Sequence, residues 1–173
     1  WTKNIELAID AFRIYRTGGG ALSMIVAGMV DHKSQEYFAK LQHLARGCEG
    51  ISFETEVSDH RMRELYEGCR AVVLSAFNED LGLTPLEGMA CGKPTIAVNR
   101  GGPKETVVNG ETGFLTEPVP EDFARAMVAL GADAALAQKM GKAGIERVKG
   151  FTWERFIDVF DTEIDRIIAT KPQ

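Results

Sequence analysis

The sequence predicts an α/β fold: a Rossmann-like, doubly wound parallel sheet with helices on both faces. Short apolar segments at 22–28, 50–54, 71–75 and 94–98 alternate with longer amphipathic segments. Strands that are apolar throughout belong to a sheet covered on both faces, and the helices between them make consecutive strands parallel. With 173 residues, of which 45% are hydrophobic and 26% charged, the chain is long enough for about one domain with its own core.

The helices are predicted from apolar residues spaced three and four apart. The first, from about 3 to 16, has Ile5, Ile9 and Phe12 on one face. The glycines at 18–20 follow this helix and precede a strand, which predicts a turn and not a phosphate-binding loop. The remaining elements are helices at about 34–46, 58–68, 120–130 and 134–148, a helix that starts at Thr84, and a last strand at 113–116.

The two ends of the chain raise separate expectations. An apolar stripe from Trp153 to Ile168 predicts a terminal helix. We expect this helix to cover the sheet, and docking of another domain is the alternative. At the start, Trp1 leads directly into a helical pattern with no strand before it, which indicates a fragment of a longer protein.

Charge and cysteine content narrow the function classes. The chain has 20 Lys and Arg against 25 Asp and Glu, a net charge of -5, so it offers no positive field for nucleic acid. Anionic small molecules remain possible ligands, because a helix N-terminus and a local cation can bind a phosphate. Three widely spaced cysteines fit a reducing, cytoplasmic compartment.

The residues from Ser75 to Val107 concentrate the chemistry, since ligands of doubly wound sheets bind at the carboxyl ends of the strands. Thr84-Pro85-Leu86-Glu87 has the form of a helix start in which Thr84 is the N-cap and Glu87 closes a capping box. The alternative role for Glu87 is to accept hydrogen bonds from a ribose diol.

The loop before this helix has two acids, Glu79 and Asp80, which in isolation would be a solvated turn. The amides of Leu81, Gly82 and Leu83 follow them at a helix N-terminus, where free N–H groups favour a negatively charged oxygen. The loop therefore predicts a place for a negatively charged oxygen beside Glu79.

Glu79, seven residues and Glu87, within NEDLGLTPLEGMACGKPTIAVNRGG, resemble the signature of the family 4 retaining nucleotide-sugar glycosyltransferases, in their C-terminal domain. Lys3-Asn4-Ile5-Glu6 resembles the family's opening lysine and helix. The closing loops are similar at Gly101-Gly102, Glu105 and the segment 109–115. The resemblance covers nearly the whole chain.

The resemblance implies the GT-B architecture, with residues 1–173 as the donor-binding domain and with the acceptor domain and the first strand of this domain absent. Lys3 and Glu79 would be the catalytic residues: Lys3 pairs with the donor diphosphate and Glu79 binds hydroxyls of the hexose. Glu87 would hold the ribose. The donor would also meet the amides of Leu81, Gly82 and Leu83, and its base would lie near Val57 and Asp59.

These roles agree with the chemistry of the reaction. Cleavage of a glycosyl diphosphate leaves negative charge on the diphosphate, which helix-end amides and Lys3 stabilise without a metal. The three histidines have no metal-ligand spacing. In a retaining glycosidase a carboxylate attacks the sugar, but the resemblance implies that Glu79 orients the hexose while the acceptor attacks from the side of the leaving phosphate.

The base and the sugar of the donor are the features that the sequence determines least. Asp59 could accept the ring N–H and amino group of guanine, which favours GDP-mannose over a UDP-sugar or ADP-glucose, but 57–59 is also an ordinary helix start with Ser58 or Asp59 as cap. Asp80 and Leu81 stand where the family has a small residue and an aromatic one. The family's glycine-arginine segment would precede Trp1, so the chain alone is expected to bind donor weakly and to be inactive.

The function expected is transfer of a hexose, with mannose favoured, to a lipid-linked or polysaccharide acceptor by a cytoplasmic protein associated peripherally with the inner face of a membrane. A non-catalytic α/β ligand-binding or regulatory module is one alternative. The other is a GT-B relative with epimerase or phosphorylase chemistry, although neither Lys93 nor Lys104 lies in a context typical of a pyridoxal phosphate lysine.

Overall fold

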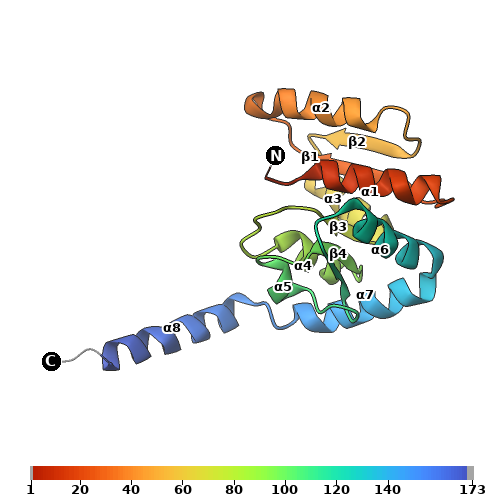
Figure 1. The fold of residues 1–173 in the computed structure, drawn as a ribbon. Coiled ribbons are helices and arrows are strands. Elements are labelled where there is room, and N and C mark those ends of the chain that lie inside the picture. Colours follow the sequence, from red (N-terminus) through yellow and green to blue (C-terminus); the bar gives the residue numbers. More distant parts are fainter. Residues whose placement is uncertain (1, 171–173) are drawn as a thin grey trace.

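The computed structural model describes residues 2–170 as an α/β domain from which one long helix projects (Figure 1). The strands are β1 (Met24–Gly28), β2 (Ile51–Thr55), β3 (Val72–Leu74), β4 (Thr95–Val98) and β5 (Gly113–Thr116). The helices are α1 (Ile5–Thr17), α2 (Gln35–Ala45), α3 (Asp59–Gly68), α4 (Leu83–Ala90), α5 (Pro103–Thr106), α6 (Pro120–Ala132), α7 (Ala134–Val148) and α8 (Trp153–Ala169). The α/β class and the alternation of strands with helices are as predicted; the short helix α5 and a 3-10 turn, η1 (His32–Ser34), were not expected.

All strand pairs are parallel, but they form two sheets where one was expected. β1 pairs with β2, and β3, β4 and β5 pair in that order. Within residues 2–170, no strand pairs with the second edge of β1 or of β3. A six-stranded doubly wound sheet has the order 3-2-1-4-5-6. The strands follow the order β2, β1, β3, β4 down Figure 1, and β1 and β3 do not pair with each other.

Helix α1 connects the two sheets. It contacts α2 on the side of the two-stranded sheet and α6 on the side of the three-stranded sheet. Its apolar face contributes Ile9 and Phe12 to the core, where they are joined by Ile96 of β4 and Phe123 of α6, all at most 3% exposed. Burial of such side chains stabilises the fold by roughly 1.5–3 kcal/mol each, so the core lies between α1, α6 and β4.

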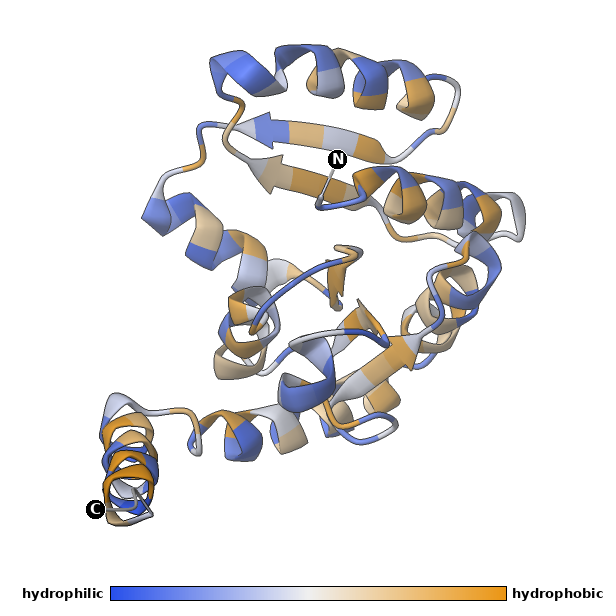
Figure 2. Ribbon diagram, turned by 60° about the vertical axis from the view of Figure 1, so that its left-hand side comes forward, coloured by the Kyte–Doolittle hydropathy of each residue, from blue (hydrophilic) through white to orange (hydrophobic). Residues whose placement is uncertain are grey.

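Helix α8 does not cover the sheet, and that expectation is wrong. Every residue of α8 is exposed, and the helix extends away from the body (Figure 1). Figure 2 shows its apolar stripe uncovered; Trp153, for example, is 78% exposed. Helix α7, by contrast, packs against α4, α6 and β5. No helix of residues 2–170 is both long and apolar enough to span a membrane.

Candidate donor-binding site

Two of the predicted site residues, Lys3 and Glu79, meet beyond the end of β3. The Lys3 ammonium donates a hydrogen bond to Glu79 Oε2 at 2.8 Å, across 76 residues of sequence. The segment before α1 is held there by its backbone, because the Lys3 carbonyl accepts from the Ser75 hydroxyl at 3.0 Å and the Thr2 carbonyl accepts from the Phe77 amide at 3.3 Å. The side chain of Glu79 is 21% exposed and that of Lys3 is 63% exposed, so Lys3 can reach a ligand in solvent.

The double glycine after β4 packs directly on the acidic loop. The Gly102 amide donates to the Glu79 carbonyl at 2.7 Å. A Cβ at Gly101 would lie 2.7 Å from that carbonyl oxygen, and a Cβ at Gly102 would lie 2.4 Å from the Leu81 carbonyl carbon. No other residue type fits at either position without moving the backbone. The glycines therefore fix the position of Glu79 and of the peptide at Leu81.

The start of α4 differs from the predicted capping box, which is wrong. The N-cap is Gly82, in the left-handed region with φ 82°, and no side chain caps the helix. Thr84 lies inside the helix, and the Glu87 side chain bonds to another helix. Within the described chain, the amides of Leu81, Gly82 and Leu83 donate no hydrogen bond. Helix α4 consequently begins with free N–H groups beside Glu79, as an anion site requires.

Glu87 is fixed by a residue that sequence reasoning missed. The hydroxyl of Tyr66, on α3, donates to Glu87 Oε2 at 2.6 Å. Tyr66 is half-buried, whereas Glu87 is exposed. Burial, and then the hydrogen bond and charge of Glu87, raise the pKa of the Tyr66 hydroxyl well above its usual value, so it remains a donor at neutral pH. The sequence signal was weak, since a tyrosine in an amphipathic helix is usually a packing residue.

The loop after β2 contains the predicted base-binding residues. The Ser58 hydroxyl accepts from the Arg61 amide at 3.2 Å and so caps α3, which confirms the ordinary helix start. Asp59 is the first helical residue, and its side chain is exposed and separate from the cap. Val57 is half-buried. Neither residue is brought into contact with Glu79 or Glu87 by the described hydrogen bonds.

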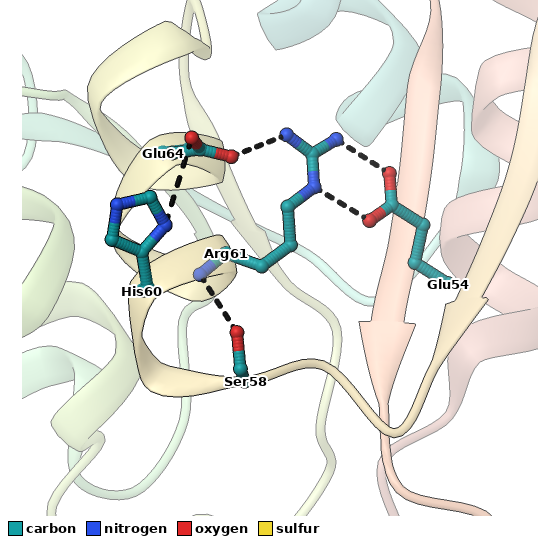
Figure 3. Close-up of polar contacts among 5 residues, drawn as sticks. All are labelled: Glu54, Ser58, His60, Arg61 and Glu64. Carbon is teal, nitrogen blue, oxygen red and sulfur yellow. Dashed lines mark hydrogen bonds and ion pairs between the residues drawn. The ribbon is translucent and has the colours of Figure 1, made fainter.

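An ion-pair network that the sequence did not reveal holds this loop (Figure 3). Arg61 donates to both oxygens of Glu54, at the end of β2, at 2.9 and 2.8 Å, and to Glu64 at 2.9 Å. Its guanidinium lowers the pKa of the Glu54 carboxyl. The bidentate pair ties the end of the strand to the first turn of α3 and so orients the intervening loop.

Backbone strain occurs beside two of the predicted site residues. Among the non-glycine residues that the structure describes, Asn4 and Glu56 have positive φ, 47° and 56°. Asn4 follows Lys3, and Glu56 precedes Val57. Such conformations cost about 1–3 kcal/mol and concentrate at functional sites.

The electrostatics of the site favour a ligand with hydroxyls as well as phosphates. Glu79 and Glu87 are hydrogen-bond acceptors, Lys3 is a cation and the start of α4 supplies partial positive charge. Asp80 is exposed, so its charge is screened by water. No group of three or more potential metal ligands of the His, Cys, Asp or Glu type occurs in residues 2–170.

Comparison with known proteins decides the family. Residues 1–147 match the family described as Glycosyl transferases group 1. The chain belongs to this family. The alpha-1,3/1,6-mannosyltransferase ALG2 of Dictyostelium discoideum is 33% identical over 181 residues, which cover 95% of this chain and 43% of that protein. This group 1 glycosyltransferase chain therefore spans less than half the length of that relative.

Solved structures agree with the fold. Sucrose-phosphate synthase from Thermosynechococcus elongatus has a TM-score of 0.76 at 26% identity, covering 98% of this group 1 chain and 44% of that protein. Anabaena Alr3699/HepE, in complex with UDP and glucose, has a TM-score of 0.77 at 22% identity, covering 98% and 45%. The fold is accordingly that of one half of a GT-B glycosyltransferase.

Proposed function

We propose that this chain is the donor-binding half of a metal-independent, retaining family 4 glycosyltransferase that transfers a hexose from a nucleoside-diphosphate sugar. The observation that carries the proposal is the Lys3–Glu79 pair at the end of β3, beside the free amides at the start of α4. A cation and helix-end amides suit the diphosphate, and a carboxylate next to them suits the hydroxyls of the sugar that the diphosphate carries.

The chemistry follows from charge development during bond cleavage. When the glycosidic bond to the diphosphate breaks, its electron pair goes to the phosphate oxygen and the sugar ring becomes electron-deficient. The amides of Leu81, Gly82 and Leu83 and the Lys3 ammonium stabilise the departing charge. Glu79 binds and orients the hexose, and the acceptor hydroxyl attacks from the face that the phosphate leaves, so the configuration at the anomeric carbon is retained.

The nucleoside of the donor occupies the neighbouring part of the site, at the carboxyl ends of the strands. Glu87 accepts hydrogen bonds from the ribose hydroxyls, and the base lies near Val57 and Asp59. The Asp59 carboxylate is free of the α3 cap, and it can accept the N–H groups of guanine. Together with the similarity to mannosyltransferase ALG2, this supports GDP-mannose as donor. The complex of HepE with UDP and glucose supports the nucleotide-sugar class and keeps UDP-sugars as the alternative.

The acceptor site belongs to another part of the protein. The chain covers 43% of the relative from Dictyostelium, and we propose that a preceding domain binds a lipid-linked or polysaccharide acceptor at the cytoplasmic face of a membrane, with which the protein associates peripherally. A strand of the same preceding segment would lie between β1 and β3, which do not pair with each other within residues 2–170. The chain alone is then inactive.

Nucleotide titration tests this assignment. We expect the full-length protein, titrated calorimetrically with GDP, UDP and ADP in metal-free buffer, to bind GDP most tightly. Tightest binding of UDP would reassign the base specificity and leave the site in place. Absence of binding for all three nucleotides would contradict the donor site.

A further inference from the structure

Tyr66 joins two helices at the point where the ribose would bind. It lies near the end of α3, and Glu87 lies in the second turn of α4, so their 2.6 Å hydrogen bond crosses between separate elements. Tyr66 is half-buried, whereas Glu87 projects into solvent. The bond therefore ties an exposed carboxylate to a half-buried side chain of another helix.

The two carboxylate oxygens of Glu87 differ in their hydrogen bonding. A glutamate side chain in solvent samples many rotamers, and a bound hydroxyl must select one of them. Tyr66 occupies Oε2, and within residues 2–170 no hydrogen bond reaches Oε1. A carboxylate held by one oxygen presents the other in a defined direction, ready to accept from a diol.

We propose that Tyr66 is a positioning residue that holds Glu87 so that its free oxygen accepts a hydrogen bond from the ribose diol of the donor. The proposal rests on the assignment of Glu87 to the ribose. Tyr66 touches no ligand itself; it lowers the cost of ordering Glu87 and so strengthens binding only of nucleotides that have the diol.

The test uses the full-length protein and two ligands, GDP and 2′,3′-dideoxy-GDP, which lacks both ribose hydroxyls. Wild type is expected to bind GDP more tightly than the dideoxy nucleotide. Tyr66→Phe, which removes only the hydroxyl, is expected to weaken GDP binding about three- to tenfold, which is the range that the net contribution of one ordinary hydrogen bond gives. Binding of the dideoxy nucleotide should not change.

A second tyrosine–glutamate pair supplies the matched control. Tyr37 on α2 donates to Glu6 on α1, so Tyr37→Phe removes a bond of the same kind away from Glu87 and should leave the ratio of the two affinities unchanged. In a Glu87→Ala background, Tyr66→Phe should have no further effect on that ratio, because the group that it positions is gone.

The outcomes separate this inference from the proposed function. If Tyr66→Phe weakens both ligands equally, Tyr66 is structural and the inference is wrong. If wild type and Tyr66→Phe prefer GDP over the dideoxy nucleotide by the same factor, and Glu87→Ala has lost that preference, the ribose assignment stands and only the role of Tyr66 fails. If wild type binds both nucleotides with equal affinity, the ribose role of Glu87 fails and this inference fails with it.

Discussion

Glu79→Ala is expected to reduce sugar transfer by the full-length protein about 100-fold while leaving its affinity for the nucleoside diphosphate nearly unchanged. On the present account Glu79 touches the hexose and not the nucleotide. Its loss leaves the diphosphate bound and the sugar poorly oriented, and misplacement of about 1 Å can cost roughly 100-fold in rate. Initial rates with a nucleotide-sugar donor, together with calorimetry with the bare nucleotide, measure the two quantities.

The fold should tolerate this change. The Lys3–Glu79 ion pair has one partner that is 63% exposed, and such surface pairs contribute about 0–1 kcal/mol. Asp80→Ala is the matched control, because this adjacent acid is exposed and turned to solvent; we expect its transfer rate to remain close to wild type. An equal loss of nucleotide affinity in Glu79→Ala would refute the division of roles between the two glutamates.

Glu87→Ala is expected to show the opposite pattern, with nucleotide affinity falling by about 10- to 100-fold. Hydrogen bonds to a charged group contribute roughly 1.5–3 kcal/mol, and each 1.4 kcal/mol corresponds to a tenfold change in affinity. The dissociation constant for the nucleotide, measured by calorimetry in wild type and variant, checks this expectation.

Glu67→Ala is a suitable control for this second prediction, since Glu67 is an exposed acid that follows Tyr66 on α3. Glu67→Ala makes the same change in net charge as Glu87→Ala. Nucleotide affinity in Glu87→Ala equal to that of Glu67→Ala would mean that charge alone, and not a specific bond to the ribose, accounts for any effect.

The elements themselves could be predicted because local patterns determine them. Apolar runs gave the five strands to within two residues at either end, and the α7 boundaries, 134–148, agree with the structure. The position of α8 could not be predicted in this way. An apolar stripe shows that a helix has a face to bury, but it does not identify the surface that the face will meet, and every residue of α8 is exposed in this structure.

The site shows the same division between local and long-range information. Lys3, Glu79 and the α4 amides were predicted to share one site, and the structure brings them together. The hydrogen bond between Tyr66 and Glu87 depends on how α3 and α4 are placed in space, which no spacing within the sequence records. The capping-box prediction failed because the left-handed Gly82 starts the helix earlier than Thr84.

The stereochemistry of transfer tests the central claim most directly. The full-length protein would be incubated with GDP-α-mannose, a lipid-linked acceptor and a metal chelator, and the anomeric configuration of the product would be determined by NMR. We expect an α-mannoside, formed at the same rate with and without the chelator. A β-linked product, or no transfer by a protein that binds the nucleotide, would contradict the account.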